Sequence, residues 1–483
     1  MSGAFHFIAI GGIGQSALAK ILLQKGVKVS GSDIYDSKYL KELRDLGAEI
    51  FIGHDAKNVP GGNVKIVLST AIKEDNPEFV EAKRRGLEIL HRSDVLKIIS
   101  EGYSDFIGFS GTHGKTTTSG LCAYVLSKIG AAPGFAIGGI IPEIGSNGGV
   151  GASSYGEMSE RQESADCLPE RMNHNGRSPR YFVAELDESD GTILKYCPSL
   201  TVINNLESDH FDFFEGGLEQ VFDVFAQFVE GLSDDAKILL NIDDAGNREF
   251  IGRHLQIGKF STFSTTRPAT YEARDITYSS SGSKFNFYFE GEKLGEVSLI
   301  IPGAHNVYNA VAVAGALIEL GFDFKTFAPH FSTFTGMGRR FQLVEEFDGI
   351  KIIDDYAHHP TEILATLEAA KKYSEGRVVA IFQPHRYTRF HGLWEEFLGA
   401  FENADLLIVL DVYKAGETPI KGFDSDDFIA QIKHDNVVRI KGDINTSAKE
   451  ILPLLKPQDT VLTLGAGDIT KMGEALNEVR CPA

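Results

Sequence analysis

Cysteine is scarce in this 483-residue sequence: only Cys122, Cys167, Cys197 and Cys481 occur, and no two of them form a C-x-x-C pair. Four distant cysteines do not make a disulfide framework, and they favour a reducing cytoplasm. Long apolar runs are missing too, since no stretch of about 18 apolar residues occurs that could span a membrane. The first residues lack a basic segment followed by a cleavage site. We therefore expect no signal peptide and a cytoplasmic location.

Basic residues are in the minority. The chain has 47 Lys and Arg against 67 Asp and Glu, a formal net charge of −20 at pH 7. Nucleic-acid backbones and anionic membranes attract basic surfaces, so we expect no nucleic acid and no membrane as a partner. Phosphorylated small molecules remain compatible with this charge, because a few local N–H groups and cations suffice to bind them.

What the sequence does contain is the composition of a folded protein, with 42% hydrophobic and 24% charged residues. At roughly 150 residues per domain, its length suggests about three domains. Short apolar runs alternate with helical patterns, which predicts an α/β fold with mostly parallel sheets. We place a Rossmann-like domain at 1–103, a P-loop ATPase-like domain at 104–332 and a second Rossmann-like domain at 333–483.

The apolar runs define the expected strands of each domain. They are Phe5–Ile10, Val27–Ser30 and Val64–Ser69 in the first; Phe106–Ser110, Tyr181–Glu185, Leu200–Asn204 and Lys237–Asn241 in the second; and Lys351–Asp354, Val378–Phe382, Leu406–Leu410 and Thr460–Leu464 in the third. A β-rich stretch at 271–301 precedes a helix of small residues at 306–320. Residues 145–180 are rich in Gly, Ser, Glu and Asn and lack periodicity, so we interpret them as a long, mobile surface insertion.

A glycine-rich loop follows the strand at 106–110 and opens a helix, with the sequence GFSGTHGKTTT over residues 108–118. In such loops backbone N–H groups wrap a polyphosphate, a lysine reaches the outer phosphates and a hydroxyl holds Mg²⁺. Lys115 and Thr116 are the candidates for these two roles. The strict G-x-x-x-x-G-K-[ST] pattern fails because residue 109 is Phe. The strand–loop–helix context nevertheless favours a phosphate site over chance glycines at a helix start.

A second glycine-rich turn, Gly12-Ile-Gly14-Gln-Ser-Ala17, matches G-x-G-x-x-A directly after the first strand, and Asp33 ends the next strand. This pattern is typical of dinucleotide binding, with the acidic residue on a ribose hydroxyl. What it requires physically is a diphosphate at a helix N-terminus, so a nucleotide sugar fits as well as a nicotinamide dinucleotide. A plain tight turn between strand and helix is the third alternative.

Four polar clusters follow other predicted strands. Residues 184–190 (AELDESD) and 207–212 (ESDHFD) are dense in the carboxylates that Mg²⁺ prefers. Residues 354–360 (DDYAHHP) and 383–389 (QPHRYTR) carry histidines, and the second string also has arginines whose forks match carboxylates and phosphates. Open α/β sheets bind ligands at the carboxyl ends of strands, which favours metal and substrate sites over solvated loops. Asn306 starts a helix, where a helix cap explains it equally well.

In this order the motifs resemble those of the Mur ligases, the ATP-dependent amide ligases of peptidoglycan precursor synthesis. The resemblance rests on GTHGKTTT, ELDESD, ESDHFD, GAHNVYNA, GRRFQ, DDYAHHPTEI and FQPHRYTR, which span nearly the whole chain. Within the family, HFIAIGGIGQSALA, DDYAHHP, FQPHRYTR and DVYKAGE are similar to the member that adds L-alanine to UDP-N-acetylmuramate. Asn204 departs from the family, which usually has Thr there, and the segment 145–180 is longer than expected.

The resemblance implies roles for individual residues. It implies a catalytic set of Lys115, Glu185, His210, Arg340 and His358. It implies that ATP contacts Gly111, Thr112, His113, Gly114, Lys115, Thr116, Thr117, His305, Asn306, Asn309 and Asp355. Mg²⁺, with two ions expected, would be held by Thr116, Glu185 and His210. The UDP-sugar would lie at Gly12, Gly14, Asp33, Ser69 and Thr70, and the amino acid at Tyr356, His358, His385, Arg386 and Arg389.

The implied reaction joins L-alanine to UDP-N-acetylmuramate at the expense of ATP. The γ-phosphoryl group would pass to the muramyl carboxylate, and the amine would displace phosphate from the acyl phosphate. His358 and water are both candidates for the base that takes the amine proton. The alternatives are a ligase that attaches a preformed tripeptide to the same sugar nucleotide, an NAD-dependent oxidoreductase and a nucleotide-binding switch. We expect a monomer or a weak homodimer.

Overall fold

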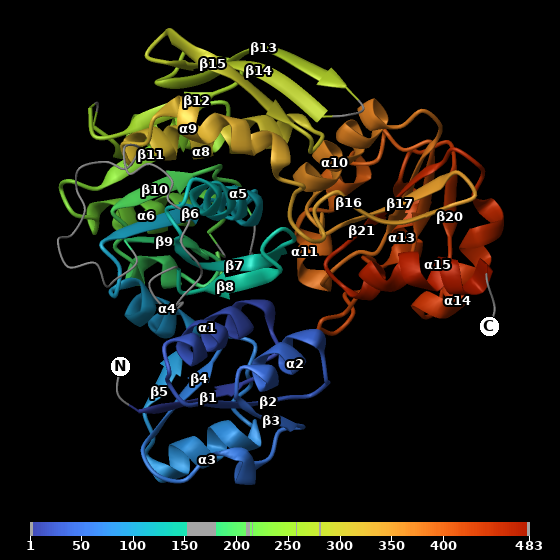
Figure 1. Ribbon diagram of the computed structural model, residues 1–483. Coiled ribbons are helices and arrows are strands. Elements are labelled where there is room, and N and C mark those ends of the chain that lie inside the picture. Colours follow the sequence, from blue (N-terminus) through green and yellow to red (C-terminus); the bar gives the residue numbers. More distant parts are fainter. Residues whose placement is uncertain are drawn as a thin grey trace. The chain divides into compact units, whose positions relative to one another are not determined.

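The computed structural model describes residues 3–151, 180–208, 213–214, 216–256, 258–279 and 282–480 (Figure 1). The chain divides into two compact units. The first comprises Met1–Leu206, Phe222–Phe263 and Ala312–His330, and the second comprises Glu207–Val221, Ser264–Val311 and Phe331–Ala483. The domain boundaries at 103/104 and 332/333 stay predictions. Among the described helices, none has the length and apolar character that a membrane crossing requires.

A parallel sheet opens the first unit. Its strands are β1 (Ala4–Ile8), β2 (Val29–Asp33), β3 (Glu49–Ile52), β4 (Val64–Leu68) and β5 (Ile89–His91), in the order β3-β2-β1-β4-β5. The helices between them are α1 (Ile13–Gln24), α2 (Lys38–Asp45), α3 (Pro77–Arg85) and α4 (Arg92–Ser100), with a short turn η1 (Ala56–Asn58). The chain leaves β1 toward β2 on one side and later reaches β4 on the other. This reversal makes the carboxyl ends of the strands beside β1 the place for a ligand.

A second sheet forms the rest of the first unit. The strands that this sheet contributes here are β6 (Asp105–Ser110), β7 (Gly134–Ile141), β8 (Ser146–Gly149), β9 (Tyr181–Glu185), β10 (Leu200–Ile203), β11 (Lys237–Asn241) and β12 (Ser261–Ser264), in the order β12-β11-β10-β6-β9-β7-β8. All of these neighbours pair in parallel except β7 and β8. The accompanying helices are α5 (Lys115–Lys128), α6 (Leu218–Glu230) and α7 (Ala245–His254), with the turn η4 (Thr192–Lys195).

Strand β8 corrects one prediction. The insertion predicted to begin at residue 145 does not begin there, because Ser146–Gly149 pairs with β7. The buried amide of Asn147 donates to the carbonyl of Ile13 at 2.7 Å and to Ser16 Oγ at 3.1 Å, which anchors β8 on α1. Since contacts distant in the sequence define this strand, its Ser, Asn and Gly residues give no local signal. The rest of the predicted insertion, 152–179, lies outside the described residues.

The second unit starts its regular structure with an antiparallel meander of β13 (Tyr271–Ser279), β14 (Gly282–Phe289) and β15 (Glu292–Leu299). The helix α8 (Ala304–Glu319) begins in this unit, and α9 (Phe324–Phe327) and η5 (Ala328–Thr333) follow it along the chain. The last sheet contains β16 (Gln342–Phe347), β17 (Ile350–Asp355), β18 (Val378–Phe382), β19 (Leu406–Val409), β20 (Val437–Arg439) and β21 (Thr460–Leu464), in the order β16-β17-β21-β18-β19-β20.

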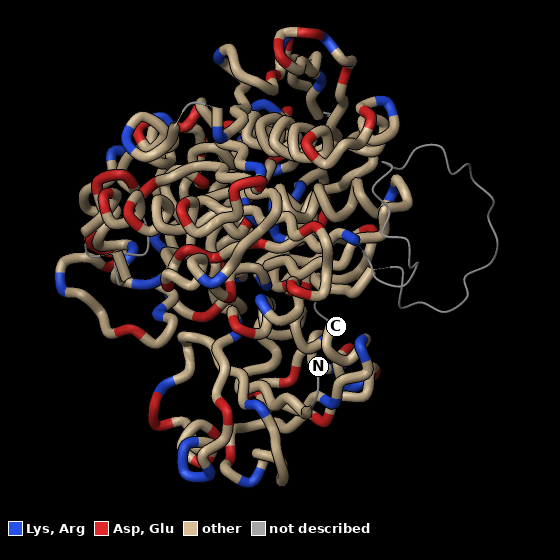
Figure 2. The backbone as a smooth tube through the Cα atoms, turned by 90° about the vertical axis from the view of Figure 1, so that its left-hand side faces the viewer, with Lys and Arg blue, Asp and Glu red and all other residues tan. Residues whose placement is uncertain are grey.

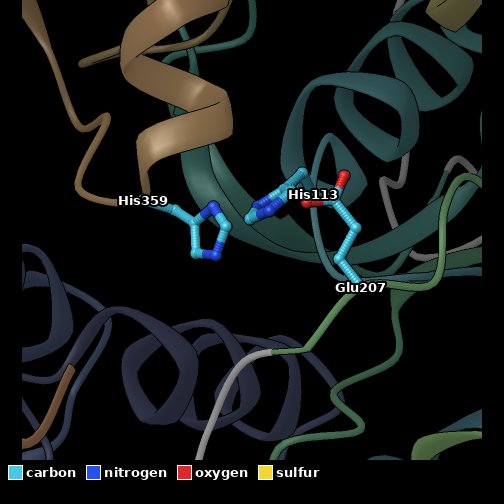
Figure 3. Close-up of side chains that lie close together, drawn as sticks. All are labelled: His113, Glu207 and His359. Carbon is cyan, nitrogen blue, oxygen red and sulfur yellow. The ribbon is translucent and has the colours of Figure 1, made fainter. Parts of the chain in front are cut away.

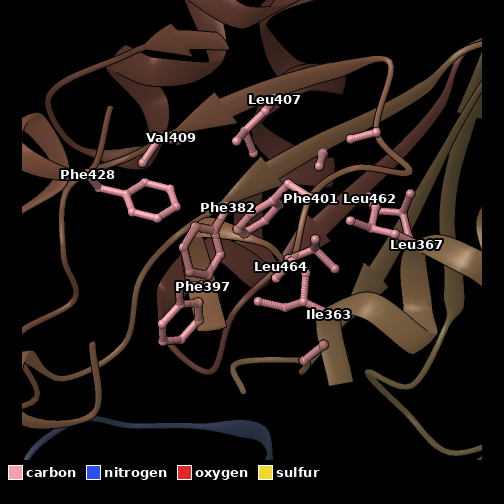
Figure 4. Packing of buried hydrophobic residues seen from close by; sticks show 14 of the residues in the cluster. Ile363, Leu367, Phe382, Phe397, Phe401, Leu407, Val409, Phe428, Leu462 and Leu464 are labelled. Carbon is pink, nitrogen blue, oxygen red and sulfur yellow. The ribbon is translucent and has the colours of Figure 1, made fainter. Parts of the chain in front are cut away.

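Helices cover both faces of this last sheet. One apolar core, shown in Figure 4, joins strand residues such as Phe382 and Leu464 to α10 (Pro360–Tyr373), α12 (Trp394–Leu398) and α13 (Ser425–Gln431). The core on the opposite face joins the sheet to α14 (Ile444–Ile451) and α15 (Met472–Arg480). The predicted α/β class with mostly parallel sheets is confirmed. In the view of Figure 2, Lys and Arg are interspersed with Asp and Glu along the described chain.

Candidate active site

The phosphate loop, residues 111–114, connects β6 to α5 and lies on the end of β10. The backbone of Gly111 has φ 113°, and a Cβ at this position would lie 2.7 Å from the carbonyl oxygen of Asn205. Asn205 Oδ1 accepts from the N–H of His113 at 2.7 Å, and its carbonyl accepts from the N–H of Thr112 at 3.1 Å. The contacts of Asn205 therefore define the shape of the loop. Phe109, which breaks the strict motif, is fully buried in β6.

The departure at Asn204 has a local explanation. Its side-chain amide is fully buried and donates to Thr118 Oγ1 at 3.1 Å and to the carbonyl of His113 at 3.3 Å. It thus connects the end of β10 to the loop and to the first turn of α5. The predicted ATP-binding residue Gly114 is the left-handed N-cap of α5, with φ 80°, and Thr117 is buried in the turn that follows.

Lys115 is folded onto its own loop. Its Nζ donates to the carbonyl of Gly111 at 2.6 Å, to that of Thr112 at 3.2 Å and to Glu188 Oε1 at 2.9 Å. Burial opposes its charge, yet the carboxylates around it, led by Glu188, raise the pKa of Lys115. Burial also raises the pKa of Glu188 to about 7, against the pull of Lys115. A phosphate would compete with Glu188 for this ammonium group.

The two described candidates for Mg²⁺ binding lie in contact. Thr116 Oγ1 donates to Glu185 Oε2 at 2.9 Å, and the N–H of Gly138 donates to the same oxygen at 3.0 Å. Hydroxyl and carboxylate oxygens are the ligand types that Mg²⁺ takes, so these residues fit the ion. The third candidate, His210, lies outside the described residues.

The glycine turn after β1 is capped by an acidic side chain. Asp33, at the end of β2, accepts from the N–H of Gly11 at 2.9 Å through Oδ2. Gly12 is the N-cap of α1 and contributes no side-chain cap, so the first turn of this helix presents backbone N–H groups. Ser69 and Thr70 follow β4 on the other side of β1. All five predicted UDP-sugar residues therefore lie at or after the carboxyl ends of β1, β2 and β4.

The second unit holds the predicted adenine-side residues. Burial, and then the charge of Arg340, lower the pKa of His305 to about 4, so its ring is neutral at pH 7. Asn306 is the third residue of α8 rather than its N-cap, and its amide donates to the carbonyl of Pro302 at 2.7 Å. The cap interpretation of Asn306 is therefore wrong. Asn309 in turn donates to Asn306 Oδ1 at 3.4 Å.

Asp355 connects two predicted site segments. Its carboxylate accepts from the N–H groups of Ala357 at 2.7 Å and Phe341 at 2.8 Å, and burial raises its pKa to about 6. The neighbouring Arg340 lies with its guanidinium 5.2 Å from the ring centre of Tyr356 and donates to Glu362 at 3.4 Å. Asp355 thus fixes the segment that carries Arg340.

The predicted amino-acid residues lie at the ends of β17 and β18. The ring of His358 is 5.1 Å from that of Tyr356 and 6.0 Å from that of His385, centre to centre. His385 stacks on Tyr413 at 5.5 Å, and burial followed by Arg389 and Arg386 lowers its pKa to about 4. A neutral ring beside two guanidinium groups suits the carboxylate of an amino acid.

A histidine and an acidic residue meet near the start of α10. Glu207 Oε2 accepts from Thr361 Oγ1 at 2.8 Å, and a ring nitrogen of His359 lies within 4.8 Å of a Glu207 carboxylate oxygen. His359 is the N-cap of α10 and accepts from the N–H of Thr361. Figure 3 shows both side chains.

The sequence analysis gave no individual role to three residues of this region. Glu188 pairs with Lys115, Asn205 holds the phosphate loop, and Asp187 accepts from Arg92 at 2.6 Å. Asp187 and Glu188 belong to the carboxylate cluster predicted at residues 184–190, whereas Asn205 was not singled out. All three lie within three residues of a strand's carboxyl end, which is the signal that could have found Asn205.

Comparison with known proteins agrees with the motifs. Residues 4–104 match the Mur ligase family, catalytic domain, 109–317 match the Mur ligase middle domain, and 339–467 match the Mur ligase glutamate ligase domain. The chain belongs to the Mur ligase family. Its similarity to individual Mur ligases extends over the full length. The UDP-N-acetylmuramate–L-alanine ligase of Geotalea daltonii is 40% identical over 98% of this chain and 97% of that protein.

Other Mur ligases are also similar to this chain over almost its whole length. The enzyme of the same name from Geobacter sulfurreducens is 39% identical over 97% of this chain and 96% of that protein. The crystal structure of the UDP-N-acetylmuramate–alanine ligase from Thermotoga maritima is 28% identical, with a TM-score of 0.78 over 99% of both chains. Membership of a ligase family along the whole chain gives no support to the oxidoreductase alternative.

Proposed function

We propose that this Mur ligase joins L-alanine to UDP-N-acetylmuramate, with ATP converted to ADP and phosphate, in peptidoglycan precursor synthesis. The observation that carries the proposal is the 40% identity to a ligase of that name over 98% of the chain. The contact between Thr116 and Glu185 beside Lys115 supports it, because a site for a triphosphate needs these groups together. The cytoplasm and a monomeric or weakly dimeric state belong to the same proposal.

The metal is part of the proposal as well. Thr116, which donates to Glu185, would hold one Mg²⁺, and Glu185 and His210 would sit at the second. When bound, Mg²⁺ offsets the negative charge that gathers between the phosphates and the muramyl carboxylate. Lys115 contributes further positive charge once a phosphate draws it from Glu188. The resemblance to the Mur ligases implies the same role for Arg340, whose guanidinium donates to Glu362.

The reaction needs ATP because a carboxylate is a poor electrophile. In the proposed sequence the muramyl carboxylate oxygen attacks the γ-phosphorus and ADP leaves. The amine of L-alanine then attacks the acyl carbon, and inorganic phosphate leaves with the former carboxylate oxygen. The protein contributes alignment and charge, which is the main catalytic requirement of phosphoryl transfer.

His358 suits the role of the base. Its Nδ1 lies 2.9 Å from the carbonyl oxygen of Tyr356, which can only accept, so Nδ1 carries the proton of the neutral ring. The lone pair then lies on Nε2, which can take the amine proton. This geometry favours His358 over water as the proton acceptor.

The test is phosphate release from ATP in the presence of Mg²⁺ and UDP-N-acetylmuramate, with L-alanine, glycine, L-serine or a tripeptide added in turn. Release that depends on L-alanine is expected. Release only with the tripeptide would instead favour the ligase that attaches a preformed tripeptide to the same sugar nucleotide. This alternative is worth testing because the structure of a peptide ligase from Neisseria meningitidis is 26% identical to this chain, with a TM-score of 0.59 over 72% of it. ATP binding with no amino-acid-dependent release would favour the nucleotide-binding switch.

A further inference from the structure

Arg92 lies between the two predicted nucleotide sites of the first unit. It is the first residue of α4, directly after β5, so it starts from the same edge of the sheet as the glycine turn after β1. Its Nη1 lies 3.3 Å from the position that a Cβ on Gly14 would occupy. Its Nη2 donates to Asp187 Oδ2 at 2.6 Å. One guanidinium group thus lies beside the glycine turn predicted to bind the sugar nucleotide. It also binds the acidic string at the end of β9, residues 185–190 (ELDESD).

Asp187 stands between the two residues that hold the phosphate-site side chains. Glu185 accepts from Thr116, and Glu188 accepts from Lys115, each at 2.9 Å. The ion pair of Asp187 with Arg92 therefore lies in the same short string as both of these contacts.

The guanidinium can serve both sides at once. It has five N–H donors in one plane, so the edge that binds Asp187 leaves donors for a second anion. The first turn of α1 favours an anion because of its backbone N–H groups and the helix dipole. A diphosphate in this turn would therefore lie beside the Nη1 side of Arg92.

We propose that Arg92 is a positioning residue that couples the sugar-nucleotide site to the ATP site. The diphosphate of the sugar nucleotide binds the Nη1 side of Arg92 and fixes the guanidinium against Asp187. The acidic string that holds Thr116 and Lys115 is fixed with it. This inference deepens the proposed function and rests on it. Each nucleotide then increases the affinity for the other by the same factor, as linkage requires.

The chain offers a matched control. Lys195 donates to Asp94 Oδ1 at 2.6 Å, which joins the turn η4 to the same helix α4. This ion pair links the same two regions of the first unit as the pair of Arg92 and Asp187, and neither of its residues belongs to the proposed binding sites. Replacing Lys195 therefore tests whether any ion pair at this place produces the coupling.

The experiment measures the binding of a non-hydrolysable ATP analogue with Mg²⁺ by calorimetry, alone and with saturating UDP or uridine. For the wild type we expect UDP to raise the affinity several-fold, within the usual range of about 5–150-fold, and uridine to have no effect. Arg92→Lys, Arg92→Met and Asp187→Asn should each abolish the effect of UDP, and the double variant should add nothing further. Lys195→Met should keep it.

The outcomes separate the two proposals. The inference is overturned if the Arg92 variants weaken analogue binding equally with and without UDP, which would be a purely structural effect. It is also overturned if UDP-N-acetylmuramate produces coupling and UDP does not, because the diphosphate would then not be the group sensed. If Arg92→Met does not fold, the same comparison is made with Arg92→Lys and Asp187→Asn, and their results decide whether Arg92 couples the two sites. A wild type that fails to release phosphate with L-alanine refutes the proposed function, whereas active ligation with coupling unchanged in the variants refutes only the role of Arg92.

Discussion

Thr116 Oγ1 donates a hydrogen bond of 2.9 Å to Glu185 Oε2, although 69 residues separate the two. Sheet topology explains the contact, because β6 and β9 are neighbours and Glu185 pairs with Phe109 just before the phosphate loop. The N–H of Gly138 binds the same oxygen. The carboxylate is thus oriented by two donors of the protein itself, which reduces the cost of ordering it on binding.

Replacing Glu185 by Gln should remove the charge at this site and keep the shape. Loss of groups that only support a metal ligand typically costs about 10–100-fold in activity or metal affinity. For a direct ligand we expect kcat to fall by at least about 100-fold, with a higher Mg²⁺ requirement. Phosphate release over a Mg²⁺ titration measures both quantities. Glu101→Gln, at an exposed position, should behave as wild type. An unchanged Mg²⁺ requirement in Glu185→Gln would remove Glu185 from the metal site.

The pair of Glu188 and Lys115 predicts a pH dependence. Burial raises the pKa of Glu188 to about 7, so above that pH its carboxylate holds Lys115 and below it the neutral acid releases it. We expect the affinity for ADP with Mg²⁺ to rise as the pH falls from about 8 to about 6. Glu188→Gln should flatten this profile, as calorimetry across the interval would show. A profile that persists in the variant would assign the titration to another group.

The same pKa shift affects folding. The folded state holds the proton of Glu188 more tightly than the unfolded chain, whose pKa is near the ordinary 4.5. This group therefore lowers the free energy of unfolding as the pH rises from about 4.5 to about 7, and the effect levels off above that pH. In Glu188→Gln that contribution is absent, so urea denaturation at several pH values should show a smaller loss of stability over this interval.

Comparing alanine variants of Gly111 and Gly130 distinguishes the effect of backbone strain from the effect of steric overlap. Both have positive φ, 113° and 80°, but only a Cβ on Gly111 would meet backbone, at 2.7 Å from the carbonyl oxygen of Asn205. Gly130→Ala should cost about 1–2 kcal/mol of stability through left-handed strain alone and keep nucleotide binding. Gly111→Ala should cost more and abolish ADP binding, because the loop has to move away from β10. Equal effects in both variants would show that the approach to β10 is unimportant.

The sequence predicted strands correctly where a strand that is buried in the fold is also a continuous run of apolar residues. Tyr181–Glu185 and Val378–Phe382 coincide with β9 and β18, because strands buried on both faces are continuous apolar runs. Strand β8 lacked such a run, since its residues are held by α1 rather than by their own propensity. The prediction failed where the stabilising partner lies far away in the sequence.

The same distinction applies to the site. Lys115 and Thr116 were identifiable because motif spacing fixes their chemistry, and Glu185 was identifiable through the resemblance to the Mur ligases. The strand order brings the three together. The partner of Lys115 was not identifiable, because Glu188 is one of four acidic residues in six positions, and only the path of the chain after β9 selects it. Motifs therefore predict which side chains bind the ligand. The residues that position these side chains depend on the packing of the folded chain, and only the structure identifies them.

Arg386 offers a test of the amino-acid site. It follows β18. Its side-chain Nε donates to Glu417 Oε1 at 2.6 Å, and its backbone N–H donates to the carbonyl of Tyr413 at 2.9 Å. Glu417 also accepts from Thr388 through both its N–H and its hydroxyl. The guanidinium is thus held in place by Glu417, and its planar fork is a group that matches a carboxylate.

Arg386→Gln should raise the KM for L-alanine by about 10–150-fold, the equivalent of about 1.5–3 kcal/mol for a charged hydrogen bond, and leave the KM for ATP nearly unchanged. Arg377→Gln is the control, because Arg377 pairs with Asp459 at 2.7 Å before the start of β18, at the other edge of the same sheet. That variant should keep both KM values, since ligands bind at the carboxyl edge. Equal losses for ATP and L-alanine in Arg386→Gln would mean that Arg386 supports the fold of the site rather than the amino acid.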